Sequence, residues 1–198
     1  IGPQQLELLR LFASSLGHLY TRKRSEEELI RKEVEERGFR EKLQALHEIN
    51  RELSRADTTM DLCRRAVDLA PGRLGFDRVG IWLTEEADRR RFRGTYGTDL
   101  QGRLRDERHN RFAVLESQHV LKQVALLERP FALRAYEATC TDGSGRKESG
   151  VQALVPLWDG REVLGVAFMD NLINKRPVTS EHVELLRLFA SDLGHLYT

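Results

Sequence analysis

The sequence is poor in the residues that mark several classes of protein. Cysteine occurs only twice, at positions 63 and 140, which is too few for a disulfide framework. No apolar run approaches the roughly 18 residues of a membrane-spanning helix, and the N-terminus carries no secretory signal. These absences indicate a protein of the reducing cytoplasm and argue against a membrane partner.

An excess of charge of either sign is also lacking, because 32 Lys and Arg residues nearly balance 31 Asp and Glu residues. Bulk nucleic-acid binders and polybasic membrane-surface proteins carry a clear basic excess, so neither class fits. Charged residues nevertheless make up 32% of the chain, against about 25% in a typical compact domain. Residues 22–42 alone hold 15 charges, which indicates a solvated helical connector.

Motifs of catalysis and metal binding are missing as well. The sequence contains no arrangement typical of a catalytic triad, no phosphate-binding loop and no dinucleotide-binding glycine motif. Its six histidines are dispersed, and none stands at the spacing of zinc ligands. The basic run from Arg89 to Arg93 follows acidic residues and is interpreted as a solvated turn. We therefore expect neither an enzyme nor a metal site.

What the sequence does contain is an internal repeat. Residues 6–21 and 183–198 are identical at 14 of 16 positions, and only the pairs Leu6/Val183 and Ser15/Asp192 differ. The offset is too long for a solenoid repeat. The simplest interpretation is a tandem array of similar domains, in which the first helix of this chain is the last helix of a preceding domain. Because the chain also lacks a starting methionine, we expect it to be a piece of a longer protein.

One long helix is predicted from Gln4 to Leu53, because apolar residues recur there at alternating steps of three and four. This spacing is typical of a parallel, two-stranded coiled coil and therefore favours a homodimer; a solvated single helix is the alternative. The predicted interface residues are Leu9, Phe12, Leu16, Leu19, Leu43, Leu46 and Leu53. We divide the chain into a connecting helix, residues 1–42, and a globular domain, residues 43–198.

The globular part is predicted to alternate helices with strands. Asp57 is a candidate N-cap for a helix that ends near Pro71, and Thr179 or Ser180 is a candidate cap for the final helix to Tyr197. Asp159-Gly160 predicts a type I′ hairpin between two apolar strands. The other expected elements are strands at 76–84, 91–97, 106–114 and 130–133, a helix at 117–127, and a long polar loop at 134–150. This order indicates an α+β fold, with an antiparallel sheet and the N- and C-terminal helices packed on one face.

Two segments carry a resemblance to a known family. Residues 150–171, GVQALVPLWDGREVLGVAFMDN, precede a loop with Arg176-Pro177-Val178 and the helix SEHVELLRLFASDLGHLY. Together with Leu74–Gly80, they are similar to the corresponding parts of bacterial GAF domains. The resemblance spans about residues 43–198. It implies a sensory or dimerising module that places ligands on the outer face of its sheet and lies beside other GAF and output domains.

The resemblance does not identify a ligand or cofactor. Cyclic-nucleotide-binding members carry an Asn-Lys-Phe-Asp-Glu constellation, and here Asn174-Lys175 is followed by neither the phenylalanine nor the aspartate. Bilin-binding members usually have a histidine after the attachment cysteine, whereas Thr141 follows Cys140. A redox sensor or sulfoxide-reducing enzyme that uses Cys140 remains an alternative. It lacks an apparent partner thiol, because Cys63 is expected on a buried helix face.

Candidate ligand-binding residues are aromatic and polar side chains near the predicted sheet, because small-molecule pockets combine apolar walls with few polar groups. They are Trp82, Tyr96, Phe131, Arg134, Tyr136, Phe168 and Asp170. The sequence thus predicts a cytoplasmic sensory module that binds a small molecule or relays a conformational change through parallel helices. A ligand-free structural spacer is the alternative.

Overall fold

The structure is a computed structural model, and it describes residues 2–85, 87–88, 90–113, 119–139 and 147–197. It divides into two units, residues 1–41 and residues 42–198. Helix α1, Pro3–Leu53, runs without interruption through Gly38. In the first unit its side chains pair along the surface, as Arg22 does with Glu26 at 2.9 Å. Such exposed pairs contribute only a few tenths of a kcal/mol each.

The second unit is a sheet with helices on both of its faces. Its helices are α2, Thr59–Leu74, α3, His119–Ala125, and α4, Ser180–Tyr197. Its strands are β1, Arg78–Thr84, β2, Arg91–Thr98, β3, Leu104–Asp106, β4, Arg111–Ala113, β5, Ala132–Thr139, β6, Lys147–Trp158, and β7, Val163–Asp170. The strand order is β3-β2-β1-β7-β6-β5, with β4 also paired to β2, and every pairing is antiparallel.

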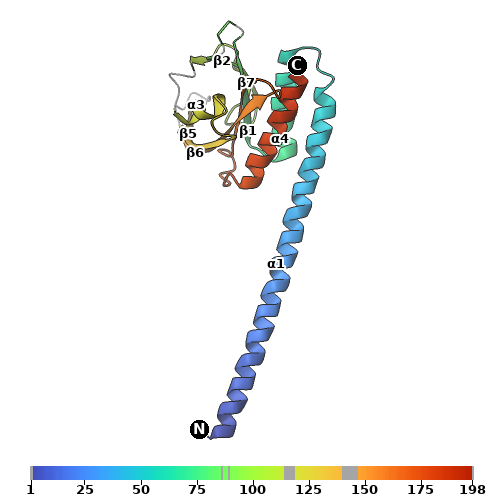
Figure 1. The fold of residues 1–198 in the computed structure, drawn as a ribbon, viewed down its shortest axis with the longest axis vertical. Helices are drawn as coiled ribbons and strands as arrows, with labels where there is room; N and C mark the ends of the chain where they lie inside the picture. The colour runs from blue at the N-terminus through green and yellow to red at the C-terminus, as the bar shows by residue number, and fades with distance from the viewer. Residues whose placement is uncertain (1, 86, 89, 114–118, 140–146, 198) are drawn as a thin grey trace. The chain divides into compact units, whose positions relative to one another are not determined.

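The two faces of the sheet bury different sets of side chains. On the inner face α2 packs on β1 and β2, and α4 packs on β6 and β7. On the outer face, α3 covers a second apolar cluster that includes Phe92, Val124 and Leu154. Figure 1 shows α3 and α4 on opposite sides of the sheet. The predicted α+β fold with an antiparallel sheet is confirmed.

Helix α2 is shifted from its predicted bounds by a few residues. Thr58, not Asp57, is its N-cap, because its side-chain oxygen accepts a hydrogen bond from the backbone N–H of Asp61 at 3.1 Å. The helix continues past Pro71 and ends where Gly75 adopts a left-handed φ of 79°. The prediction for α4 is confirmed, because it begins at Ser180 and the Thr179 hydroxyl accepts from the N–H of His182 at 3.4 Å.

The long polar loop predicted at 134–150 is wrong. Residues 134–139 and 147–150 extend β5 and β6, which pair from Ala132 opposite Leu154 to Thr139 opposite Lys147. Polar side chains fit these strands because β5 is an edge strand and alternate residues on it face solvent. Residues 140–146, including Cys140, lie outside the described residues.

The polar strand predicted at 106–114 is also wrong, because it is broken in the middle. Two short strands, β3 and β4, pair with different parts of β2. Between them the chain turns at Glu107–Asn110, where the Asn110 N–H donates to the Glu107 carbonyl at 2.9 Å. This turn brings Glu107 onto the outer face of the sheet.

The hairpin between β6 and β7 is confirmed, but its turn differs from the type I′ prediction. Only Gly160 has a positive φ, 96°, whereas a type I′ turn needs one at Asp159 too. The Asp159 carboxylate instead accepts from the backbone N–H groups of Arg161 and Glu162, both at 2.8 Å. The connection between the strands is therefore longer than a two-residue turn, and hydrogen bonds to the Asp159 side chain stabilise it.

The residues predicted to form an interface between chains differ in how far the structure buries them. Leu46 and Leu53 are 5% and 1% exposed inside the domain's own core, so their assignment to an interface between chains is wrong. Leu43 is half-buried, while Leu16 and Leu19 are 50% and 63% exposed. The side chains of Leu9 and Phe12 lie outside the described residues. Of the helices that the structure describes, none is both long and apolar enough to cross a bilayer.

Candidate functional site

A cavity of about 450 Å³ lies on the outer face of the sheet. Its size falls in the range of small-molecule sites. Four aromatic side chains line it, Trp82, Phe112, Tyr136 and Phe168. Six long polar side chains join them: Arg78, Arg105, Glu107, Asn110, Arg134 and Gln152.

Strand register explains why residues so distant in sequence meet here. Arg78 of β1 lies opposite Asp170 of β7, Asp170 lies opposite Gln152 of β6, and Gln152 lies opposite Arg134 of β5. Residues directly opposite one another on antiparallel strands point to the same face of the sheet. These four side chains therefore form one polar row across four strands, with an arginine at each end.

The polar row is held by ion pairing and hydrogen bonding. The Nε atom of Arg78 lies 3.3 Å from the Oδ1 atom of Asp170, and both side chains are buried, at 8% and 0% exposure. At the other end, Arg134 donates to the Gln152 carbonyl oxygen from Nε at 2.9 Å and from Nη2 at 2.6 Å. The ring of Tyr136 lies 5.8 Å from the Arg78 guanidinium carbon and 5.3 Å from that of Arg134. Both guanidinium groups therefore gain cation–π stabilisation from one ring.

The neighbouring row of the same face forms an aromatic floor. Gly80 of β1 lies opposite Phe168 of β7, and a Cβ at Gly80 would come within 2.1 Å of the Phe168 ring. The missing side chain thus leaves room for the far edge of the Phe168 ring beside β1. Trp82 packs on Phe112 with ring centroids 4.8 Å apart, and Phe112 stacks on Phe92 at 5.2 Å. One end of the cavity is polar, and its remaining wall is aromatic.

Glu107 lies over two further glycines. A Cβ at Gly94 would come within 2.4 Å of the Glu107 backbone oxygen, and one at Gly97 within 2.7 Å of its carboxylate. Burial raises the pKa of this carboxyl, although the charges of Arg105 and Arg78 and a hydrogen bond from Trp82 oppose the shift. The cavity therefore contains a carboxyl group whose pKa lies above its ordinary value.

Burial also shifts the pKa values of two members of the polar row, Asp170 and Arg134. It raises the pKa of Asp170, against the opposing charge of Arg78. It lowers the pKa of Arg134, although an arginine remains charged at neutral pH. These shifts have one physical cause, because a charge in a poorly hydrated environment costs free energy. Asp170 and Arg134 are thus ionisable groups with incomplete solvation.

Four of the seven predicted ligand-binding residues line the cavity: Trp82, Arg134, Tyr136 and Phe168. Asp170 is buried beside it and pairs with Arg78. The other two lie outside its wall. Tyr96 packs beneath the guanidinium of Arg108, 5.7 Å from the ring centroid, and Phe131 precedes β5 and is 39% exposed.

Sequence reasoning missed Arg78, Gln152 and Glu107. Arg78 alternates with Val79, Ile81 and Leu83 along a predicted strand, so its position on the Trp82 face was detectable. Gln152 is likewise a polar residue in an otherwise apolar strand. Glu107 gave no such signal, because a strand was predicted across the turn that carries it.

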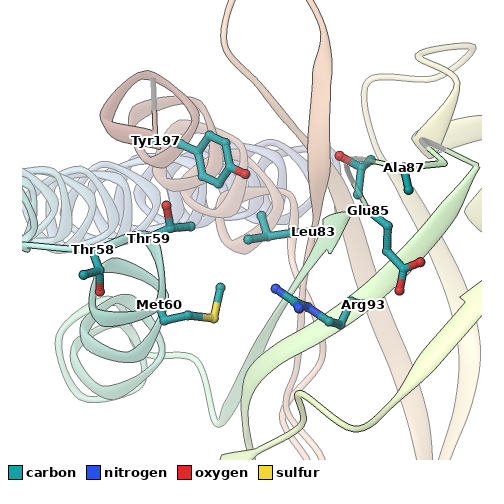
Figure 2. A pocket seen from close by; sticks show the side chains of 9 residues that line it. Thr58, Thr59, Met60, Leu83, Glu85, Ala87, Arg93 and Tyr197 are labelled. Atoms are coloured by element: carbon teal, nitrogen blue, oxygen red, sulfur yellow. The ribbon is translucent and has the colours of Figure 1, made fainter.

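A second hollow, of about 620 Å³, lies where α2 begins and α4 ends. In Figure 2 the side chains of Leu83 and Tyr197 point toward its centre, and Arg93 reaches into it from β2. The Glu85 carboxylate is paired with Arg111 at 2.9 Å. Its walls come from the ends of several elements and contain no row of buried charges among the described residues. We therefore consider the smaller cavity the stronger candidate.

The described residues offer little support for redox or metal chemistry. Burial raises the pKa of the Cys63 thiol to about 11, so almost no thiolate is present at neutral pH. Within the described ranges, no three His, Cys, Asp or Glu side chains gather as metal ligands would. Cys140, on which the redox alternative depends, lies outside the described residues.

Comparison with known proteins agrees with this architecture. The model of the GAF domain family matches residues 59–195. No curated protein matches the chain. Similar solved structures include the GAF domain of an Acinetobacter phosphoenolpyruvate-protein phosphotransferase, at 16% identity and a TM-score of 0.57 over 79% of this chain and 92% of that one.

Two further structures are similar to a comparable degree. One is the phycoerythrobilin-bound GAF domain of a cyanobacterial phytochrome, at 12% identity and a TM-score of 0.57, covering 78% of this chain and 93% of that one. The other is a methyl-accepting chemotaxis protein, residues 122 to 287, at 15% identity and a TM-score of 0.55, covering 75% and 93%. At these identities the likeness shows the fold alone.

Proposed function

The chain belongs to the GAF domain family, and we propose that it is the sensory module of a bacterial, cytoplasmic signalling protein. It binds a small molecule in the cavity on the outer face of its sheet. The observation that carries this proposal is the polar row from Arg78 to Arg134 beside an aromatic floor. Phytochrome and chemotaxis proteins among the similar structures support a signalling role. The module has no catalytic activity of its own.

The sheet provides a physical route from the cavity to the helices. Successive residues of a strand face opposite sides, so β6 presents Gln152 and Leu154 to the cavity and Val155 to the core beneath α4. Helix α4 is joined to α1 by the Lys42–Glu181 ion pair at 2.8 Å and by the Asn50–Asp192 hydrogen bond. A ligand that shifts β6 therefore changes the packing of both helices.

Thermal unfolding with small-molecule pools tests the binding proposal. A ligand at a hundredfold excess over its Kd stabilises the folded state by about 2.7 kcal/mol, or roughly 5–10 °C for a chain of this size. Asn110→Trp fills the cavity from the turn after β3, and His109→Trp places the same side chain on its exposed neighbour. A pool that stabilises the parent and His109→Trp, but not Asn110→Trp, supports the proposal. Equal shifts in all three would mean that the ligand binds outside this cavity and would contradict the proposal, whereas no shift in any of them would favour a ligand-free spacer.

We further propose that the first helical segment packs on a preceding domain of the same kind. In α4, Leu193 is 1% exposed, and a Cβ at Gly194 would come within 2.4 Å of the Trp158 carbonyl oxygen. The repeat equivalents are Leu16, which is 50% exposed, and Gly17, which has no atom within 4 Å of such a Cβ. The same sequence is thus buried against a sheet in one place and open in the other. A second sheet like this one is the partner that fits it.

A parallel homodimer is proposed through a different part of α1. Leu19, Ile30 and Val34 are 63%, 61% and 63% exposed. Eleven residues make about three turns of helix, so Ile30 lies on nearly the same face as Leu19, and Val34 lies one turn further. The repeat assigns Leu9, Phe12 and Leu16 to the preceding domain. Leu19, Ile30 and Val34, which we name the apolar stripe, therefore carry the contact between chains.

A further inference from the structure

We propose that His182 makes the junction of α1 and α4 sensitive to pH: its neutral imidazole caps the start of α4, and protonation opens that cap. This inference goes beyond the proposed function, because it holds whether or not the cavity contains a ligand. His182 lies in the first turn of α4, which begins at Ser180. The same turn carries Glu181, whose ion pair with Lys42 connects α4 to α1.

Two reciprocal hydrogen bonds close the first turn of α4. The Thr179 hydroxyl accepts from the backbone N–H of His182 at 3.4 Å, and the backbone N–H of Thr179 donates to Nδ1 of the His182 ring at 3.1 Å. This is the arrangement of a capping box, in which the residue three positions after the cap returns a hydrogen bond to the N–H of the cap, and in which Glu or Gln usually fills that position. The corresponding residue of the repeat is Gln5, which precedes residues 6–21 as His182 precedes residues 183–198. In α4 a histidine therefore fills the position of a glutamine.

The returned hydrogen bond requires a neutral ring with a lone pair on Nδ1. A protonated imidazole carries an N–H on both nitrogens and accepts no hydrogen bond. Protonation of His182 therefore removes the acceptor of the Thr179 N–H and sets two donors against each other. The Thr179 hydroxyl lies 2.9 Å from Nδ1 and can accept from the new N–H, but the backbone group loses its partner. A positive charge at the N-terminus of a helix is also unfavourable for the helix dipole.

The surroundings of this imidazole favour its neutral form. Burial is the largest influence on its pKa and lowers it from 6.5. The positive charges of Lys42 in α1 and of Arg176 in the loop before α4 lower the pKa further. The negative charges of Glu181 in α4 and of Asp77 before β1 oppose the shift. Phe76 adds an apolar neighbour, with its ring centroid 6.3 Å from that of the imidazole.

The sign of the pH dependence follows from this lowered pKa. The capping contribution of His182 is fully present above pH 6.5, and it is lost as the pH falls through the folded-state pKa. Protonation also adds a positive charge near Lys42, whose ion pair with Glu181 at 2.8 Å connects α1 to α4. Mild acid therefore loosens the first turn of α4 and weakens its contact with α1.

NMR titration of the complete chain between pH 8 and pH 4.5 tests the proposal. The His182 imidazole should titrate below pH 6.5, and the Thr179 amide signal should move with the same midpoint. The protection of that amide from hydrogen exchange, relative to its intrinsic rate, should fall about tenfold or more, as expected for the loss of one hydrogen bond. His182→Gln keeps an acceptor without the change of charge, so Thr179 should stay protected throughout. His47→Gln, at an exposed histidine of α1, is the control and should behave as the parent.

Three outcomes would overturn the proposal. The first is a Thr179 amide that does not follow the titration of His182, because the ring would then not be its acceptor. The second is a pKa of His182 at or above 6.5, and the third is the same loss of protection in His182→Gln as in the parent. The first two are measured on the parent chain, so they remain decisive if a substitution prevents folding.

Discussion

Single glycine residues set the depth of the cavity, because each of them replaces a side chain that would fill it. Gly94 and Gly97 of β2 both lie beneath Glu107, but they face different parts of it. Gly94 faces its backbone oxygen, which the β2–β4 pairing holds in place, whereas Gly97 faces the carboxylate at the end of a flexible side chain. Two chemically identical substitutions therefore test the position of Glu107.

Gly94→Ala should destabilise the fold by about 1–3 kcal/mol, because the backbone of the turn must shift. Gly97→Ala should cost clearly less, because only the carboxylate must move and a strand favours alanine over glycine. Urea unfolding of the two variants measures the difference. Equal effects would mean that Glu107 is not held over β2 as described.

The ionisation of Glu107 gives a second prediction at this scale. Its pKa is raised by burial, so its stabilising contribution is present below the ordinary value of 4.5 and is lost as the pH rises through the folded-state pKa. Glu107→Gln lacks this loss. The unfolding free energy of the variant, relative to the parent, should therefore increase between pH 4.5 and pH 8. A constant or decreasing difference, measured in parallel urea titrations, would contradict the buried environment of this carboxyl.

Among the elements, α4 and its repeat at the start of α1 offer an internal comparison. Gly194→Ala should destabilise this domain by about 1–3 kcal/mol, because its Cβ would collide with the Trp158 carbonyl. Gly17→Ala should stabilise the isolated chain slightly, since alanine is the better helix former by about 1 kcal/mol and its Cβ meets nothing.

The same Gly17→Ala substitution should become destabilising in any longer chain that contains the preceding domain, because Gly17 would then occupy the position of Gly194. Calorimetry of both lengths checks this reversal of sign. A stabilising effect in both would show that the segment does not pack on a sheet as α4 does.

Sequence patterns predicted the elements that are rich in buried apolar residues, and they failed where the chain is polar or short. Helix α4 shows a clear period because it buries one face, and the central strands β1 and β7 are largely apolar because both of their faces are mostly buried. Residues 134–139 of β5 and 147–150 of β6 were interpreted as part of a loop, because their side chains are mostly polar and leave little apolar alternation in the sequence. The break between β3 and β4 was missed for a related reason, because strands of three residues are too short to show a period.

The candidate site was predicted only in part, because it depends on register. Trp82, Arg134, Tyr136 and Phe168 were found as conspicuous residues of predicted strands or of the presumed loop. Their meeting point was not predictable, since the row from Arg78 to Arg134 exists only once four strands are aligned. A shift of one residue in any pair would move the side chain to the opposite face.

For the whole molecule, the apolar stripe predicts a dimer in solution. Light scattering should give twice the mass of one chain, and Ile30→Glu should return the mass of a monomer because it places a charge in the stripe. Leu29→Glu is the matched control: Leu29 is 60% exposed, against 61% for Ile30, but lies off the stripe. A monomeric parent chain, or the same effect from both substitutions, would rule out this interface.

The central claim, that the cavity on the outer face of the sheet holds the ligand, can be tested through the two tryptophans. Trp82 lines that cavity, whereas Trp158 is 43% exposed and lies beneath α4 near Pro130 and Leu188. An amide correlation spectrum therefore contains one indole N–H signal from each location. We predict that a small molecule that stabilises the chain in thermal unfolding shifts the Trp82 signal saturably and leaves the Trp158 signal in place. A shift of Trp158 alone, or of neither signal at saturating concentrations, would contradict the account.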